Sequence, residues 1–273
     1  MAWRVGSVPY VNAAPLVWGL AARGVEVVYD IPSCLPALLE VGDVQAILVS
    51  SVYALVNPGL RMVSGVGIAS DGPVTSVKVF SRVPLSAVQS LALDASSMSS
   101  NRLALEVLRS YGSAPATASL PPDLGLMLSE CDACVLIGDI GMSSHLPGVR
   151  EYDLGDEWKE MTGLPFLWAG WVGSEALSPE LADVLTGAGL AAGCGAGLSD
   201  DPSTSETREK VIAAAAASSG LPESTVRPYL TSTMTYPLTA SVKAGFEEYA
   251  RRINAPFFPS WLGAPAATPE LFR

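Results

Sequence analysis

Polar residues follow four apolar segments of the sequence at the points where those segments end. Each segment is a short run typical of a buried strand, and hydroxyl, amide or carboxylate groups come directly after it. The residues are Tyr10, Asn12, Ser50, Ser51, Ser97, Ser99, Ser100 and Asp139, with Gly138 beside the last. Because parallel strands end at one edge of a sheet, where the next helices begin, we expect these residues to line one ligand site. Such groups at helix starts bind carboxylates, so the pattern predicts a small anionic ligand.

Several of these residues also have a purely structural interpretation. Asn12, Ser51 and Ser99 are ordinary helix N-caps, and Asp139 can bond the amides of its own turn. The segment "SSMSS" (96–100), however, has four hydroxyls in five residues, which is more than a single cap needs. Capping and ligand binding are therefore open alternatives at these positions.

Residues for metal or nucleophilic catalysis do not form a recognisable pattern. Cys131 and Cys134 ("CDAC") have neither a second cysteine pair nor a nearby histidine, and the single histidine of the chain is His145. The sequence has no P-loop, no GxSxG and no GxGxxG after a strand. We therefore interpret the two cysteines as free thiols and expect no metal site. An enzyme with these residues would act by positioning a substrate that is already prone to react.

The composition excludes several classes of partner. The chain has 273 residues, of which 49% are hydrophobic and 16% charged, which is typical of a globular protein. Its formal net charge of −11 argues against nucleic acid or an anionic membrane surface as a partner. No run approaches the ~20 apolar residues of a transmembrane helix, and the start "MAWRVGSVPYVN" lacks an apolar secretory core. We expect a cytoplasmic protein with no nucleic-acid or membrane partner; nothing in the sequence predicts its oligomeric state.

Strand and helix patterns alternate through the first two thirds of the chain. Short apolar runs predict strands at 3–8, 25–30, 44–50, 60–70 and 90–94, and the segment "ACVLIGDIGM" (133–142) predicts a strand that ends in a Gly-Asp turn at 138–139. Helical patterns follow at 13–23, 34–42, 51–57, 96–112 and 121–130. Ser33 is the expected N-cap of the second of these helices. Two longer extended segments lie at 74–83 and 166–173, and helices are predicted downstream at 179–193, 203–218, 222–230 and 237–253.

Two strand–helix series joined by two extended segments predict two lobes with a two-segment hinge. We expect an α/β protein with a two-lobed periplasmic-binding-protein type II-like fold and a helical C-terminal third. The first lobe is expected to comprise residues 1–80 and 173–273, and the second lobe residues 81–172. The ligand cleft would lie between the lobes. Ser76, on the first extended segment, would face either side depending on its register.

Several sequence blocks resemble one enzyme family. They run in order from residue 4 to residue 172 and include "RVGSVPYVNAAPL", "ALLEVGDVQAILVSSVYAL", "LALDASSMSSNRLALEVL" and "YDLGDEWKEMTGLPFLWAGW". Together they resemble the chorismate dehydratases of the futalosine route to menaquinone. The resemblance implies that chorismate loses water to give 3-[(1-carboxyvinyl)oxy]benzoate, without a metal or organic cofactor.

The resemblance also implies roles for individual residues. Asn12 matches the functional asparagine of the opening block and would stabilise an enolate-like state, while Ser76 would bind a carboxylate or the departing hydroxyl. Ser51 and the segment 96–100 would hold the substrate carboxylates. The substrate's own enolpyruvyl carboxylate could take the proton. The family leads us to expect a basic residue within 96–100, where this sequence has Met98.

Two alternative functions are compatible with the same expected fold. One is the sister enzyme of that pathway, which releases 1,4-dihydroxy-6-naphthoate, and the other is a non-catalytic protein that binds small anions. Because a fold does not determine a function, the molecule that the purified protein consumes or binds has to distinguish them.

Overall fold

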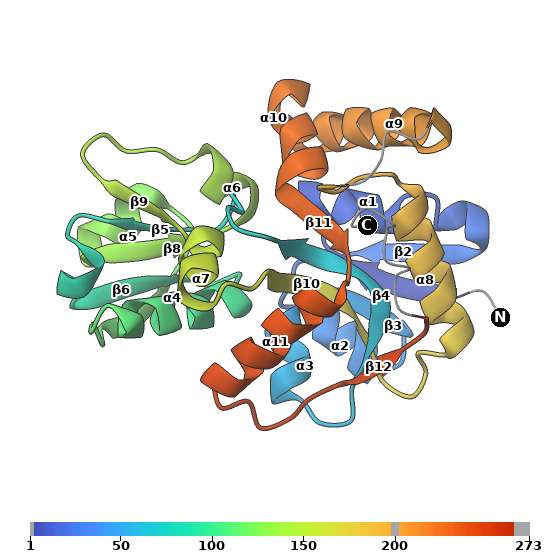
Figure 1. Cartoon of the computed structure of the whole chain (residues 1–273), viewed down its shortest axis with the longest axis horizontal. Coiled ribbons are helices and arrows are strands. Elements are labelled where there is room, and N and C mark those ends of the chain that lie inside the picture. Colours follow the sequence, from blue (N-terminus) through green and yellow to red (C-terminus); the bar gives the residue numbers. More distant parts are fainter. Residues whose placement is uncertain (1–2, 198–201, 265–273) are drawn as a thin grey trace.

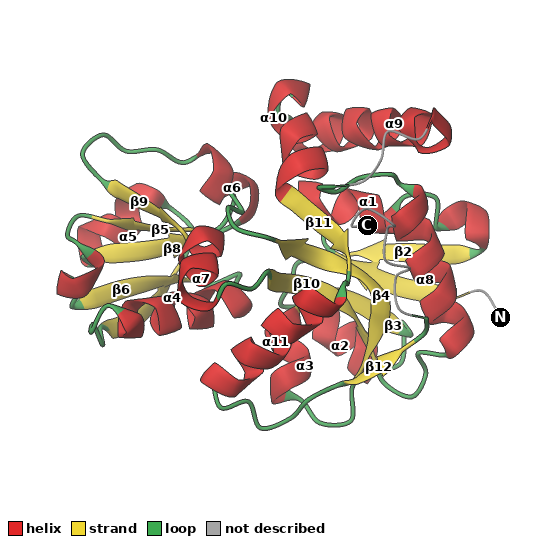
Figure 2. Ribbon diagram, viewed as in Figure 1, coloured by secondary structure: helices red, strands yellow, loops and turns green. Residues whose placement is uncertain are grey.

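Two β-sheets flanked by helices make up the computed structural model, which describes residues 3–197 and 202–264. The sheets form two lobes that lie side by side, and two segments of the chain run between them (Figure 1). Figure 2 shows that helices surround both sheets. The two-lobed α/β fold predicted from the sequence is therefore confirmed.

The sheet of the first lobe has seven strands and is mixed. Its strands are β1 (Trp3–Ser7), β2 (Val25–Tyr29), β3 (Ala46–Ser50), β4 (Arg61–Ser70), β10 (Phe166–Gly173), β11 (Met234–Pro237) and β12 (Ser260–Leu262). They are ordered β11-β4-β10-β3-β1-β2, and β12 pairs with β4. β1 is parallel to β2 and β3, whereas β10 is antiparallel to β3 and β4. The parallel pairing brings the ends of β1 and β3 to the same edge.

The sheet of the second lobe has five strands. They are β5 (Lys78–Ser81), β6 (Ser90–Asp94), β7 (Ala116–Leu120), β8 (Ala133–Leu136) and β9 (Arg150–Asp153), in the order β7-β6-β8-β5-β9. β6 is parallel to β7 and β8, and β5 is antiparallel to β8 and β9. The ends of β6 and β8 therefore lie at one edge of this sheet.

Helices cover both sheets. Those of the first lobe are α1 (Ala14–Val17), α2 (Leu35–Glu40), α3 (Ser51–Val56), α8 (Pro179–Ala191), α9 (Pro202–Ser219), α10 (Glu223–Pro228) and α11 (Ala240–Arg252). Those of the second lobe are α4 (Ser99–Ser110), α5 (Leu124–Glu130), α6 (Gly138–Ser143) and α7 (Leu154–Thr162). α4 is amphipathic and buries its Leu103, Val107 and Leu108, which explains why this pattern was readable in the sequence.

The chain crosses between the lobes at two places that differ from the expected boundaries. β5 pairs with β8 and β9, so the first crossing lies at 71–77 and not after residue 80. β10 pairs with β3 and β4, so the chain has already returned at Phe166 and not at residue 173. We therefore propose lobe boundaries at these two crossings.

Both crossings are packed closely against helices. A Cβ atom on Gly155 of α7 would lie 2.2 Å from the Gly72 carbonyl oxygen, and one on Gly245 of α11 would lie 2.0 Å from the Pro165 carbonyl oxygen. Only glycine permits such approaches of two backbones. The two helices therefore hold the crossings at van der Waals distance.

An aromatic cluster lies beside the return crossing. Phe166 makes edge contacts with Trp158 of α7 and Tyr249 of α11, at 5.2 and 4.8 Å between ring centroids. Trp168 packs on the same ring at 4.4 Å. All four side chains are buried. Because α7 and α11 belong to different lobes, the cluster joins the lobes through apolar contact.

The predicted helix 13–23 was wrong in its extent. The α-helix ends at Val17, because Trp18 has extended backbone angles and Gly19 has a left-handed φ of 70°. A 3₁₀ turn at Ala21–Arg23 follows. The apolar spacing reflects burial of this segment, and it does not require one continuous helix.

The predicted strand at 74–83 was too long, whereas the strand predicted from residue 133 ends close to its predicted Gly-Asp turn. Thr75 has a φ of 58°, which interrupts the extended backbone of the first crossing, and only β5 remains of the predicted strand. β8 ends at Leu136, and Gly138, with a φ of 61°, opens α6. A left-handed φ interrupts the extended backbone of a strand, so both strand boundaries have a local cause.

The prediction of a helical C-terminal third was correct for its main helices but left out several shorter elements. α10 is followed by a π-helical turn at Tyr229–Thr233, and α11 begins at Ala240, where the Thr239 hydroxyl accepts a hydrogen bond from the Val242 amide. The sequence patterns did not predict β7, β9, α7, β11 or β12. Nor is Ser33 the N-cap of α2, because that position is occupied by Cys34.

Candidate active site

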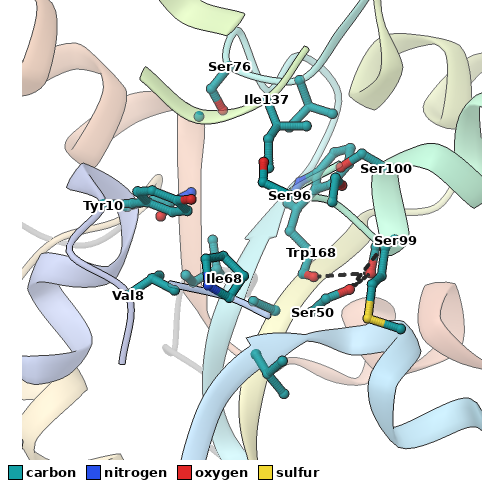
Figure 3. A pocket seen from close by; sticks show the side chains of 18 of the residues that line it. Val8, Tyr10, Ser50, Ile68, Ser76, Ser96, Ser99, Ser100, Ile137 and Trp168 are labelled. Carbon is teal, nitrogen blue, oxygen red and sulfur yellow. Dashed lines mark hydrogen bonds between the residues drawn. The ribbon is translucent and has the colours of Figure 1, made fainter. Parts of the chain in front are cut away.

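A cavity of about 200 Å³ lies between the two lobes. Eight of the ten predicted site residues line it, and Ser51 and Asp139 do not. The eight are Tyr10, Asn12, Ser50, Ser76, Ser97, Ser99, Ser100 and Gly138. Figure 3 shows several of these side chains converging on the cavity from different elements. The topology therefore brings together groups that are separated by up to 128 positions, the interval from Tyr10 to Gly138.

The turn after β1 presents Tyr10 and Asn12. A 3₁₀ turn at Val11–Ala13 begins four residues beyond the end of β1, and Asn12 donates a hydrogen bond from Nδ2 to the Tyr229 hydroxyl at 3.3 Å. The N-cap positions of this turn and of α1 are held by Tyr10 and Ala13, so the N-cap interpretation of Asn12 is wrong. Burial, helped by the nearby charge of Asp94, raises the pKa of the Tyr10 phenol, so this group is a neutral hydrogen-bonding group at physiological pH.

The first crossing presents Ser76 from a strained stretch of backbone. The carboxylate of Asp153 accepts hydrogen bonds from the Val74 amide at 2.9 Å and from the Thr75 amide at 2.6 Å. These bonds hold Thr75 in its left-handed conformation. Ser76 is fully buried, and its Oγ lies 2.8 Å from the hydroxyl of Tyr229.

A hydroxyl cluster joins the lobes at one end of the cavity. The Ser99 amide, at the start of α4, donates to Ser50 Oγ at 3.0 Å, and the hydroxyls of these two residues are in close contact. Ser99 Oγ also accepts a hydrogen bond from the Val52 amide at 3.2 Å. Ser51 is buried behind this cluster, where its hydroxyl donates to the Leu167 carbonyl oxygen at 2.7 Å. Ser51 therefore supports Ser99 and has no direct access to the cavity.

The serine-rich segment wraps one side of the cavity through local hydrogen bonds. The amide and hydroxyl of Ser96 donate to Asp94 Oδ1 at 2.8 and 2.5 Å. Asn101 donates from Nδ2 to the carbonyl oxygens of Asp94 and Ser97. The N-cap residue of α4 is Met98, whose side chain makes no cap hydrogen bond, and the Ser99 amide is satisfied by Ser50 Oγ instead. Ser99 and Ser100 of the first turn of this 12-residue helix line the cavity, and the backbone N–H groups of a first turn have no partner within the helix.

Asp139 lies in the first turn of α6, beside the cavity and not on its wall. Burial raises the pKa of its carboxyl above the ordinary value. Its charge also contributes, after burial and Asp94, to the raised pKa of Tyr10. The neighbouring Gly138 is the residue of this pair that contacts the ligand space.

Sequence reasoning missed most of the apolar wall and one polar residue behind it. The additional lining residues include Val8, Ser33, Ile68, Val74, Ser96, Ile137 and Trp168. The indole of Trp168 donates to Ser70 Oγ at 3.0 Å, which fixes its ring. Tyr229 was missed because it follows Asn12 by 217 positions and no local pattern links them. Of these residues, only Ser96 was indicated by a sequence pattern, because it belongs to the hydroxyl-rich segment 96–100.

The cavity wall is uncharged. None of its described lining residues is a lysine, arginine or histidine. Among the residues outside the masked ranges, no group of three His, Cys, Asp or Glu side chains is placed to hold a metal ion. Burial raises the pKa of the Cys134 thiol to about 12, which disfavours the thiolate needed for redox chemistry at "CDAC". In the same described part of the chain, no helix has the length and apolar character to cross a membrane.

The topology defines a two-lobed α/β protein with a periplasmic-binding-protein-like fold and a cavity between the lobes. A protein from Archaeoglobus fulgidus has a similar structure, with a TM-score of 0.70 and 20% identity over 92% of this chain and 96% of that chain. The periplasmic aliphatic sulphonate binding protein SsuA of Escherichia coli is also similar, with a TM-score of 0.65 and 18% identity over 99% and 96% of the two chains. At these identities the likeness shows the fold alone.

The chain belongs to the menaquinone biosynthesis family, whose sequence model matches residues 3–255. It is 32% identical to the chorismate dehydratase of Thermus thermophilus over 180 residues. That match covers 59% of this chain and 66% of the relative, just under two thirds of the relative's length. The family predicted from the sequence blocks is therefore confirmed.

Proposed function

We propose that this protein is a chorismate dehydratase, a hydro-lyase that converts chorismate to 3-[(1-carboxyvinyl)oxy]benzoate and water in the futalosine pathway. The observation that carries the proposal is the uncharged cavity between the lobes, which Asn12 and Ser76 line together with the first turn of α4. The identity to the Thermus thermophilus enzyme supports the same substrate. We keep the predicted cytoplasmic location as part of the proposal.

The proposed reaction is a 1,2-elimination that completes an aromatic ring. The C–H bond at the ether-bearing ring carbon breaks, its electron pair enters the ring, and the neighbouring carbon loses its hydroxyl, which leaves as water after taking up a proton. Because aromaticity supplies the driving force, the protein has to orient the substrate, exclude bulk water and stabilise the developing charge. None of these tasks calls for an organic cofactor.

We assign these tasks to the residues of the cavity. The Asn12 amide would stabilise the enolate-like state, and the Ser76 hydroxyl would bind a carboxylate or the departing hydroxyl. The first turn of α4, with Ser97, Ser99 and Ser100, would hold a carboxylate through hydroxyl and backbone N–H groups. The substrate's enolpyruvyl carboxylate would accept the ring proton, since it lies next to that carbon in chorismate.

Turnover of chorismate by the purified protein tests the proposal. With chorismate in buffer, and the products followed by chromatography and mass spectrometry, we expect a product lighter than chorismate by one water. Asn12→Ala should reduce kcat by about 10²–10³-fold, the usual cost of losing one donor to a developing anion, with an unchanged thermal unfolding temperature. Unchanged chorismate with the folded wild-type protein would refute the proposal. The remaining alternatives would be the naphthoate-releasing enzyme, tested by turnover of cyclic futalosine derivatives, and an anion-binding protein, tested by ligand-induced thermal shifts.

A further inference from the structure

Tyr229 joins the two residues to which the proposed function assigns the chemistry. Its hydroxyl lies 2.8 Å from Ser76 Oγ and accepts a hydrogen bond from Asn12 Nδ2 at 3.3 Å. We propose that Tyr229 is a positioning residue, which sets the directions in which Asn12 and Ser76 offer hydrogen bonds to the ligand. The inference deepens the proposed function and rests on it for the identity of the ligand.

The direction of the hydrogen bonds follows from the number of protons available. A phenol has one proton to donate, and Asn12 already donates to the oxygen of Tyr229. Ser76 Oγ is the remaining partner of that hydroxyl in the described structure, so the phenol proton goes to Ser76. Burial raises the pKa of Tyr229 to about 12, which keeps this proton in place at physiological pH.

The Ser76 hydroxyl then has its own proton free for the ligand. A serine hydroxyl that accepts from Tyr229 can direct its O–H elsewhere, and Ser76 lies on the cavity wall. Figure 3 shows the Ser76 side chain among those that line the cavity, next to Ile137 in this view. Tyr229 thereby makes Ser76 a donor, which suits a carboxylate or a departing hydroxyl.

Asn12 is oriented by the same contact. One N–H of its amide is held by Tyr229, so the plane of the amide is defined and the second N–H remains for the ligand. Without the phenol oxygen the amide could rotate about its last torsion, which has a broad energy profile. A fixed donor stabilises developing charge better than one that must reorient during the reaction.

The position of the Ser76 backbone and the direction of the Ser76 hydroxyl proton are set by different residues. Asp153 fixes the backbone of the crossing through the Val74 and Thr75 amides, whereas Tyr229 contacts the Ser76 side chain itself. Tyr229 is buried and begins the turn after α10, so loss of its hydroxyl leaves these backbone bonds unchanged. The role of Tyr229 can therefore be tested without disturbing the crossing.

Tyr229→Phe is the test, and Tyr236→Phe is its matched control. Tyr236 is fully buried in β11, and in the described structure its hydroxyl has no hydrogen-bond partner. With chorismate as substrate, we expect Tyr229→Phe to lower kcat about tenfold with KM within about twofold, and Tyr236→Phe to stay within about twofold in both. A kcat of Tyr229→Phe within twofold of wild type would overturn the inference.

A double-mutant cycle with Ser76→Ala separates positioning from general support of the fold. If Tyr229 acts through Ser76, Tyr229→Phe should cause a much smaller further loss of kcat in the Ser76→Ala background than in wild type. Effects that multiply would count against the inference. Thermal unfolding of the same four proteins provides a readout without substrate, in which non-additive changes support the link and additive changes overturn it. Failure of wild type to consume chorismate would instead refute the proposed function, so the two failures are distinguishable.

Discussion

The polar part of the cavity is formed by hydroxyl and amide groups. None of the described lining residues has a cationic side chain. A dianionic ligand would therefore be held by short-range, directional hydrogen bonds and by the N–H groups at the start of α4. Such groups determine the orientation of a ligand, whereas cations mainly add long-range attraction. Met98 is the position at which a cation can most easily be added to these hydrogen-bonding groups, because it lines the cavity and is 43% exposed.

Met98→Arg should strengthen the binding of chorismate. A guanidinium at the mouth of the cavity would form a charge-assisted bond to a carboxylate, and we expect KM to fall about fivefold at low ionic strength. The gain should shrink as salt is added, since the site is partly open to solvent. Leu126→Arg is the control, because Leu126 is similarly exposed on α5 and lies away from the cavity. An equal fall of KM in both variants would mean that net charge is responsible.

At the scale of the elements, carboxylates hold loop backbones in place at the starts and ends of strands. Asp153 does so at the first crossing. Asp132 does so in the second lobe, where its carboxylate accepts the amides of Gln89 and Ser90, at the start of β6, at 2.9 and 3.0 Å. These bonds, the one from Gln89 first, lower the pKa of Asp132 below its ordinary value. The carboxylate therefore links the start of β6 to the turn before β8.

Asp132→Asn should destabilise the protein in a pH-dependent way. A lowered pKa in the folded state means that the ionised carboxylate adds stability above the unfolded-state pKa, and that this stability is lost as the pH falls through the folded-state value. We expect the variant to unfold about 2 °C below wild type at pH 7, and the difference to shrink below the ordinary aspartate pKa of about 3.9 and to vanish once the folded-state carboxyl is protonated. Asp43→Asn, at an exposed position after α2, controls for the change in net charge. A difference that persisted in acid would show that packing is responsible.

At the scale of the whole molecule, Ser99 joins the lobes. It belongs to α4 of the second lobe, and its partners Ser50 and Val52 belong to the first. Tyr249 of α11 donates to the Ser99 carbonyl oxygen at 3.1 Å, which adds a third contact from the first lobe. The described conformation is therefore one in which the lobes are closed on the cavity.

Ser99→Ala should shift the protein toward a more open arrangement of its lobes. The variant loses the hydroxyl contacts to Ser50 and the Val52 amide, so closure has to be driven to a greater extent by the ligand. We expect KM to rise about tenfold and the radius of gyration from X-ray scattering to increase without ligand. Ser110→Ala, at the other end of α4, should change neither, because the Ser110 hydroxyl bonds within its own helix. An unchanged radius of gyration in Ser99→Ala would contradict this role.

The fold was predictable because its signals are local. Short apolar runs followed by helical patterns indicate parallel strands with covering helices, and this periodicity is independent of what lies elsewhere in the chain. The same logic places polar residues at strand ends, and eight of the ten predicted positions line the cavity, although their roles in ligand binding stay predictions. Errors occurred where a single backbone angle decided the outcome, as at Gly19 and Thr75.

The sequence by itself determined the family, the two-lobed architecture and the polar groups after β1, β3, β6 and β8, because each depends on residues that are neighbours along the chain. Only the tertiary structure decided which of these groups face the cavity, and it placed Ser51 behind the wall and Tyr229 between Asn12 and Ser76. A hydrogen bond across 217 positions leaves no trace in local composition or periodicity. It exists because packing of the C-terminal segment against the first lobe brings the phenol to that point.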